Sequence, residues 1–275
     1  MGSFPDDASS SLASAQPTSV DKSNTIAYQR GSATSEHPKS SDASSLNRVV
    51  RVSQLRFSHV PTAVGAIEGA FETDALKMYM TGQDGISASR PTIASRIFEI
   101  LLILYNLLRL ISFQVLSGRS FVIVSPPPVL GKRQGWKGIL DDVVDTAWMF
   151  VMRIKRISSS DVAKRRRINY RKQQTAVIEA TIGDRTNDMY CIETLATHPD
   201  FQGRGYAGTL MKAVAELANS ERRSVWLVAS GPQNVPFYTS HGYKTVGQIR
   251  LGDDDETWKG GLLVCDVMVK EYSPL

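Results

Sequence analysis

The alternation of hydrophobic and polar residues separates a polar amino-terminal tail from a longer segment with strand and helix patterns. Residues 1–46 are rich in Ser, Ala, Thr and Asp and contain few large apolar side chains. Such a segment cannot bury enough apolar surface to offset the entropy of ordering it. We therefore expect a disordered tail over 1–46, either simply solvated or phosphorylated on its serines, and one folded domain over 47–275.

Within the folded part, period-two and continuous apolar runs predict strands, and apolar residues three and four positions apart predict helices. The predicted strands cover 49–57, 120–124, 175–182, 189–197, 225–229, 243–251 and 262–270. The predicted helices cover 61–80, as one or two short helices, and 136–157, 206–219 and 236–241. Residues 183–188 carry a turn signal, so we expect 175–182 and 189–197 to pair as a hairpin.

The most apolar stretch of the chain is 97–116. Glu99, Asn106 and Arg109 interrupt it and fall on one narrow stripe of a helical projection. A charged residue at the centre of a bilayer is costly, which disfavours a membrane span. We favour a buried or substrate-covering helix, with a helix lying on a membrane surface as the alternative.

A strand pattern leads through a glycine-rich turn into a helix over 189–219, with glycines at 203, 205 and 208. The first amides of a helix lack intrahelical partners, and glycines let the backbone approach an anion closely. Arg204 adds a positive charge. A P-loop is excluded because its Gly-Lys-Ser/Thr ending is absent. The dinucleotide pattern G-x-G-x-x-G fits 203–208 literally, but its later acidic residue is not cleanly placed. The alternative to an anion-binding loop is an ordinary tight turn without a ligand.

The pattern Gln202-x-x-Gly205-x-Ala207 is similar to the acyl-CoA pyrophosphate motif Q/R-x-x-G-x-G/A of the GNAT superfamily of N-acetyltransferases. A strand that ends in Leu-Ala-Thr-His-Pro precedes it, and 234–243 resembles the superfamily's Asn…Phe-Tyr…Gly-Phe/Tyr segment with compact spacing. The resemblance covers 175–270 well and 48–125 loosely, and the proline-rich end of the strand at 120–124 is similar to fungal-type members. It implies an α/β GNAT fold: a mixed, mostly antiparallel sheet of six or seven strands flanked by helices. An extra apolar helix is expected near 95–117, and the acyl-CoA-binding core over 175–270.

The resemblance also implies acetyl-CoA as co-substrate, a primary amine as acceptor, and direct transfer in a ternary complex. The cofactor-binding residues that it implies are Leu195, Ala196, Thr197, Gln202, Gly203, Arg204, Gly205, Tyr206, Ala207 and Asn234. Backbone groups around 195–197 would pair with the pantetheine arm, and the turn amides would bind the pyrophosphate. Asn234 would contact the pantetheine or cap a helix, two roles that are compatible.

Two residues are candidates for proton transfer. Tyr238 matches the superfamily tyrosine that returns a proton to the leaving thiolate, with a core aromatic as the alternative. Glu193, expected to share a strand face with Cys191 and Leu195, is the candidate base, with mere substrate positioning as the alternative. His198 is expected to be a turn residue.

The amino-acid composition and net charge indicate which kinds of ligand and which cellular location to expect. The net charge of +5 and the isoelectric point of about 9.2 suit an anionic cofactor without demanding nucleic acid. With only two cysteines, the chain cannot form a disulfide framework. Neither cysteine belongs to a zinc-ligand pattern in the sequence. No secretory signal is evident, so we expect a cytoplasmic protein. The basic run 164–167 leaves a nuclear location open, but no aromatic platform accompanies it, and we expect a solvated helix face or loop rather than a nucleic-acid patch.

These observations favour a small-molecule N-acetyltransferase. A nuclear protein or histone acetyltransferase and a non-catalytic CoA-binding module remain the alternatives. The oligomeric state cannot be deduced from the sequence.

Overall fold

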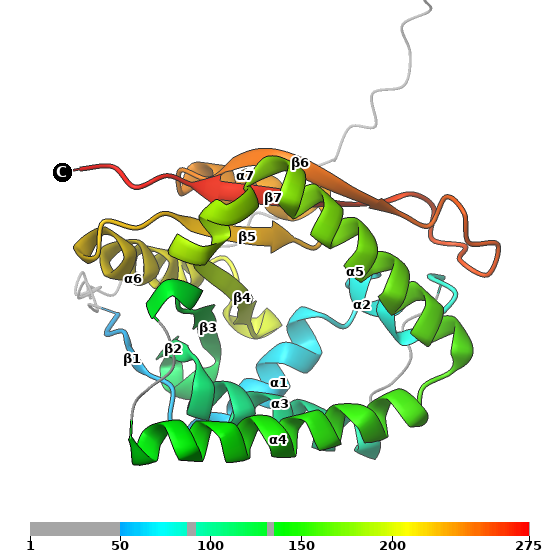
Figure 1. Cartoon of the computed structure of the whole chain (residues 1–275), viewed down its shortest axis with the longest axis horizontal. Coiled ribbons are helices and arrows are strands. Elements are labelled where there is room, and N and C mark those ends of the chain that lie inside the picture. The colour runs from blue at the N-terminus through cyan, green and yellow to red at the C-terminus, as the bar shows by residue number, and fades with distance from the viewer. Residues whose placement is uncertain (1–49, 87–91, 131–134, 275) are drawn as a thin grey trace, which may run out of the picture. The chain divides into compact units, whose positions relative to one another are not determined.

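A seven-stranded sheet forms the centre of the domain (Figure 1). The structure is a computed structural model that describes residues 50–86, 92–130 and 135–274, so the predicted disordered tail over 1–46 lies outside the described part. The strands are β1 (Ser53–Gln54), β2 (Ile111–Val115), β3 (Ser120–Ser125), β4 (Tyr190–Thr197), β5 (Val225–Ala229), β6 (Lys244–Leu251) and β7 (Leu263–Lys270). Their spatial order is β1-β2-β3-β4-β5-β7-β6. All neighbours are antiparallel except β4 and β5, which confirms the predicted mixed sheet.

Helices cover both faces of this sheet. They are α1 (Val60–Ala70), α2 (Ala75–Thr81), α3 (Ile93–Arg109), α4 (Trp136–Ile157), α5 (Asp161–Thr181), α6 (Tyr206–Ser220) and α7 (Val235–Ser240). Leu210, Met211 and Val214 of α6 pack on one face, against β3, β4 and β5. On the opposite face, α1 and α3 cover β3, whereas α2 and α5 cover β6 and β7.

The predicted strand over 175–182 is wrong, because these residues continue α5. Ser160 caps the start of α5 by accepting a hydrogen bond from the Ala163 amide, and the helix runs without a break to Thr181. Val177 and Ile178 pack from the helix onto the sheet, so tertiary packing overrides the strand preference of this β-branched segment. The predicted hairpin is therefore absent, and 183–188 form a 3-10 turn between α5 and β4.

The apolar stretch 97–116 divides into α3 and β2. The helix ends at Arg109, and β2 then alternates in the sheet, so the prediction of a helix extending to 116 is wrong at its carboxyl end. Glu99 and Asn106 are buried, and Arg109 donates two hydrogen bonds to Asp145 of α4, of 2.8 and 3.0 Å. The polar stripe thus faces the protein. None of the helices in the described part is both long and apolar enough to cross a bilayer.

Of the predicted first strand over 49–57, the described residues 50–57 are mostly irregular: Ser53 and Gln54 form β1, and the Leu55 amide donates one further hydrogen bond to the Ser112 carbonyl of β2. The prediction over 61–80 corresponds to two short helices, α1 and α2, and the other predicted strands and helices match observed elements within a few residues.

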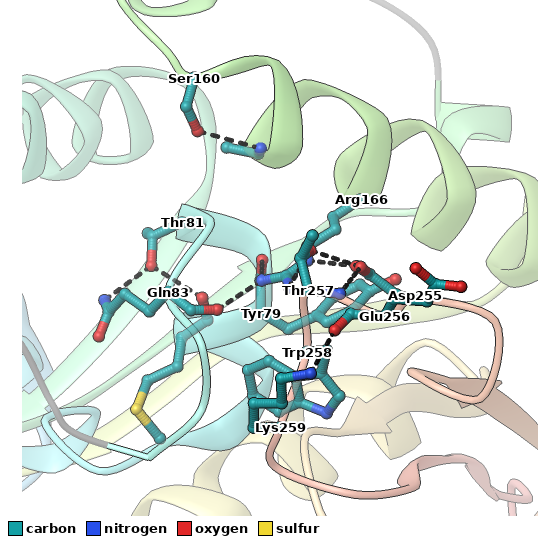
Figure 2. A network of polar contacts seen from close by, with 12 residues as sticks. Tyr79, Thr81, Gln83, Ser160, Arg166, Asp255, Glu256, Thr257, Trp258 and Lys259 are labelled. Carbon is teal, nitrogen blue, oxygen red and sulfur yellow. Dashed lines mark hydrogen bonds and ion pairs between the residues drawn. The ribbon is translucent and has the colours of Figure 1, made fainter.

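The basic run is not a uniformly solvated face, because Arg166 is buried and ties three segments together (Figure 2). Its guanidinium donates to Asp255 at 2.5 Å, to Thr257 at 3.0 Å and to the Gln83 carbonyl at 2.5 Å. Burial alone would raise the pKa of Asp255, but the hydrogen bonds from Arg166 and Thr257 hold that pKa below its ordinary value. The network joins α5, the end of α2 and the β6–β7 loop.

Replacing Arg166 by Ala leaves these acceptors without their buried donor. We expect Arg166→Ala to lower the free energy of unfolding at pH 7 by about 3 kcal/mol in urea denaturation. Arg165→Ala, which removes an exposed neighbour, should cost about 0.5 kcal/mol or less. Because the pKa of Asp255 is lowered in the folded state, its contribution is present above about pH 4 and is lost as the pH falls further. Equal losses for the two variants at pH 7 would contradict the proposed network.

Candidate functional site

Strands β4 and β5 separate along their length. They pair only where Tyr190, Cys191 and Ile192 lie opposite Val225, Trp226 and Leu227. Beyond Ile192, β4 continues to Thr197 paired with β3 alone. The edge of 193–197 that faces β5 therefore has no strand partner among the described residues, and its backbone groups can pair with an extended ligand.

Glu193 lies at the point where the two strands part. Val124 pairs with Ile192 and Ile123 pairs with Thr194, so Glu193 is the extra residue of a β-bulge. The Ser125 hydroxyl donates a 2.6 Å hydrogen bond to its exposed carboxylate. Bulges change the direction of side chains and are frequent near active sites.

The bulge also changes the faces of the following residues. Leu195 packs on the α6 side of the sheet, and Ala196 packs on the α1 side. Glu193 and Cys191 are close enough for the carboxylate to raise the pKa of the thiol, after burial, which is the larger cause. The prediction that Leu195 shares their face is wrong because it assumed unbroken alternation.

The glycine-rich turn presents a run of unpaired amides. Gly203 and Gly205 have φ of 72° and 79°, and α6 begins at Tyr206 without a side-chain cap. None of the amides of 203–208 donates a hydrogen bond within the described part of the chain. A Cβ built on either glycine meets no atom within 4 Å, so the backbone is open to an approaching group. Amides of this kind at a helix start form an anion-binding site.

Two arginines add positive charge beside this turn. The guanidiniums of Arg119 and Arg204 lie 5.2 and 5.4 Å from the centre of the Phe201 ring. Neither forms an ion pair with any described residue. Sequence reasoning missed Arg119, because it precedes β3 and reaches the turn only through the sheet.

Gln202 and His198 shape the turn. The Gln202 side chain donates a 3.0 Å hydrogen bond to the Thr197 carbonyl, and so fixes the turn to the end of β4. His198 accepts from the Asp200 amide at 3.3 Å and caps the short 3-10 turn 199–201, as predicted for a turn residue.

Tyr238 projects from α7 and packs edge-on against Phe237 and Tyr243, with ring centroids 5.3 and 6.1 Å apart. Burial raises the pKa of Tyr238 to about 12. Its hydroxyl has no hydrogen-bond partner among the described residues. A phenol with such a pKa holds its proton at neutral pH and has an unused donor.

Asn234 does not cap α7 with its side chain. Its amide donates at 3.3 Å to Ser230, whose hydroxyl donates at 2.6 Å to Asp74. Asp74 also accepts from the Lys77 amide at 2.7 Å and so caps α2. This chain of contacts holds α2 against the carboxyl end of β5. Asn234, which the sequence predicts to bind the cofactor, lies just after that strand. Sequence reasoning missed Ser230 and Asp74, which have no motif.

Tyr170 of α5 is a further residue that the sequence did not indicate. Burial raises the pKa of Tyr170 well above its ordinary value, and Cys265, Cys191 and Glu193 raise it further. Tyr170 therefore lies near the bulge, on the sheet face that α5 covers. Both cysteines are buried and free, and in the described part of the chain no three His, Cys, Asp or Glu side chains form a metal-binding group.

The structure thus gathers these predicted residues into three groups along one path. Gln202, Gly203, Arg204, Gly205, Tyr206 and Ala207 lie in the glycine-rich turn and the start of α6, and Leu195, Ala196 and Thr197 lie on the open strand edge before it. Asn234 and Tyr238 follow the end of β5, across the gap from that edge.

Comparison with known proteins agrees with this geometry. Residues 165–245 match the family model described as acetyltransferase (GNAT) domain. The fold resembles arylalkylamine N-acetyltransferase 2 from Aedes aegypti (TM-score 0.53, 16% identity, 82% of this chain and 100% of that chain). It also resembles a polyamine N-acetyltransferase from Drosophila melanogaster (TM-score 0.50, 13% identity, 81% and 99%). No curated protein sequence matches the chain significantly.

The GNAT fold is defined by a mixed sheet in which two parallel strands separate, as β4 and β5 do, and by a glycine-rich turn that leads into a helix, as at the start of α6. Over residues 165–245 the chain therefore resembles the GNAT acetyltransferase superfamily in sequence, and its fold is GNAT-like. That it is of fungal type stays a prediction.

The contact between Asp74 and Ser230 can be tested by stability. We expect Asp74→Ala to lower the free energy of unfolding by about 1–2 kcal/mol. The change removes both the side-chain cap of α2 and the acceptor of the hydrogen bond from the Ser230 hydroxyl. Asp84→Ala is the matched control, since exposed Asp84 accepts only a local amide at 3.0 Å and its loss should cost less. Urea denaturation of both variants measures the difference, and a cost for Asp84→Ala as large as that for Asp74→Ala would contradict this role.

Proposed function

We propose that the protein transfers an acetyl group from acetyl-CoA to the primary amine of a small molecule, by direct attack in a ternary complex. The observation that carries the proposal is the run of unpaired amides at 203–208, directly after the open edge of β4. A diphosphate matches the amides and the two free arginines in charge, and an extended pantetheine matches the strand edge in shape.

The residues present fit coenzyme A. The amides of 203–208 and the guanidiniums of Arg119 and Arg204 would bind the diphosphate. The backbone of Leu195, Ala196 and Thr197 would pair with the pantetheine amides, and the free Asn234 carbonyl oxygen is available from the opposite side of the gap. When bound, acetyl-CoA supplies an activated acyl group as a thioester.

Tyr238 is proposed as the general acid. The reaction forms a bond between the acceptor nitrogen and the acyl carbon and breaks the bond from that carbon to sulfur, so the sulfur needs a proton. The pKa of Tyr238, about 12, keeps the phenol protonated at neutral pH, and its hydroxyl is unused within the described residues. Such a donor can protonate a leaving thiolate as charge develops on it.

Glu193 is proposed to accept the proton that the amine loses, directly or through water. It lies where β4 and β5 part, and its carboxylate is exposed and held by Ser125. The alternative, that Glu193 only positions the acceptor, predicts a change in acceptor KM rather than in kcat.

A small cationic amine is the favoured acceptor. Glu193 and Asp74 place carboxylates on the α5 and α2 side of the site, where an ammonium group would be attracted. The two insect proteins that share the fold are named as arylalkylamine and polyamine acetyltransferases. A nuclear protein acceptor has less support, because buried Arg166 takes part in the fold rather than in an exposed basic patch.

Coenzyme A binding tests the anion cradle. We expect Gly205→Asp to weaken binding in calorimetry by about 100-fold or more, because the added carboxylate occupies the amides and repels the diphosphate. Gly183→Asp is the matched control: Gly183 also has positive φ (59°), and its Cβ position is also open. The control should bind as the parent does, and unchanged affinity in Gly205→Asp would overturn the proposed cradle.

Turnover tests the role of Tyr238. We expect Tyr238→Phe to lower kcat for acetyl transfer to an amine panel by about 100-fold, with the Kd for coenzyme A nearly unchanged. Tyr243→Phe is the control, because the Tyr243 hydroxyl is buried without a hydrogen-bond partner and its removal should be nearly neutral.

The pH dependence has a defined sign. Because the pKa of Tyr238 is raised, the parent enzyme should not lose activity by deprotonation of this phenol below about pH 11. A parental alkaline limb near pH 10 that disappears in Tyr238→Phe would contradict the raised pKa. If thiol release does not depend on an amine, or if no thiol is released, the result favours a CoA-binding module that does not transfer the acetyl group.

A further inference from the structure

Helix α4 exposes a stripe of large apolar side chains along its whole length. These residues, here called the outer stripe, recur at intervals of three, four or seven positions and are 50–71% exposed: Trp136, Ile139, Val143, Phe150, Ile154 and Ile157. Residues at this spacing lie on one side of a helix. A continuous apolar face of this length is unusual on a protein surface unless it binds something.

The opposite face of α4 explains why the outer stripe is not used in the core. Asp141 and Asp145 point inward and pair with Arg109 of α3, at 2.7 and 2.8 Å. Trp148 stacks on Tyr105 of α3, with ring centroids 4.7 Å apart. Helices α3 and α4 therefore lie side by side through ionic and aromatic contacts (Figure 1), and the apolar side of α4 faces away from α3.

A basic cavity lies beside the carboxyl-terminal part of the outer stripe, between α4 and α5. Its volume is about 480 Å³, and it is lined by apolar and basic side chains without any acid: Met149, Met152, Ile168, Arg153, Lys155, Arg156, Lys164, Arg167 and Arg171. Arg153, Arg156 and Arg171 form no ion pair with any described residue.

The cations of this cavity oppose one another. Burial, and then the charge of Arg167, lower the pKa of Lys155 to about 8. Burial, and then the charge of Arg171, lower the pKa of Arg167. An anion that enters the cavity would relieve this repulsion, and the three apolar side chains would contact an acyl or glycerol segment attached to it.

We propose that α4 and the basic cavity bind the surface of a membrane that contains anionic lipids. The outer stripe lies in the interface, and the cavity takes phosphate-bearing headgroups. Trp136 at the start of the stripe suits the headgroup level, where an indole can bury its ring and keep its N–H hydrated. The site differs from the membrane contact through 97–116 considered from the sequence, since α3 directs its polar stripe inward and α4 directs its apolar stripe outward.

Charge selects the membrane over a second copy of this chain. Each copy carries a net charge of +5, and the cavity presents unpaired arginines, so an anionic surface is complementary where another copy is not. Binding of this kind needs neither coenzyme A nor an amine and is therefore independent of the proposed function.

Flotation of the full chain with vesicles tests the proposal. We expect it to float with vesicles of phosphatidylcholine and phosphatidylserine in equal amounts and not with phosphatidylcholine alone, with binding that weakens as salt rises. Phe150→Ser with Ile154→Ser should lower the bound fraction about tenfold or more, and Arg153→Glu with Arg156→Glu should do the same.

The matched controls carry the same changes at exposed positions away from α4. Val246→Ser with Leu262→Ser, and Lys212→Glu with Lys244→Glu, should bind as the parent does. Since all eight positions are exposed, circular dichroism and thermal melting should show that every variant is folded. The proposal is overturned if binding does not depend on anionic lipid. It is also overturned if neither Phe150→Ser with Ile154→Ser nor Arg153→Glu with Arg156→Glu weakens binding. So does a dimer in light scattering that Phe150→Ser with Ile154→Ser dissociates while vesicle binding is absent.

Discussion

The separation of β5 from β4 after Ile192 is the constraint on which the candidate site depends. Pairing with β3 continues to Thr197, so the rest of β4 stays extended although it no longer pairs with β5. The bulge at Glu193 falls at the same point, and the Ser125 hydroxyl holds its exposed carboxylate there. The Gln202 side chain then ties the turn at 202–205, and with it the unpaired amides that begin α6, to the Thr197 carbonyl at the end of that edge. One continuous segment, 193–208, thus provides the strand edge, the carboxylate and the unpaired amides that we propose bind a diphosphate.

The sequence predicts this segment well because its signals are local. Positive φ at glycines, a helix start without a cap and a preceding apolar strand all follow from neighbouring residues. The remaining parts of the site come from distant segments: Arg119 from the start of β3, Asp74 from the cap of α2, and Tyr170 from α5. No spacing along one chain reveals that such residues meet, because only the packing of the sheet brings them together.

The errors in secondary structure have a related cause. Residues 175–182 have the composition of a strand, yet they extend a long helix that packs Val177 and Ile178 on the sheet. The helix prediction over 97–116 continued past Arg109 because apolar content alone does not distinguish a buried helix from the strand that follows it. The polar stripe of Glu99, Asn106 and Arg109 was correctly located, but its inward direction depends on partners in α2 and α4.

Helices α4 and α5 leave the sheet at the end of β3 and return to it at the start of β4, and these two strands are neighbours. The polypeptide therefore makes its whole helical excursion between two adjacent points, without crossing any other connection. Insertions at such a place leave the order and register of every strand unchanged. A surface as large as that of α4 can be gained, lengthened or lost there during evolution while the arrangement of β4, β5 and the glycine-rich turn stays the same.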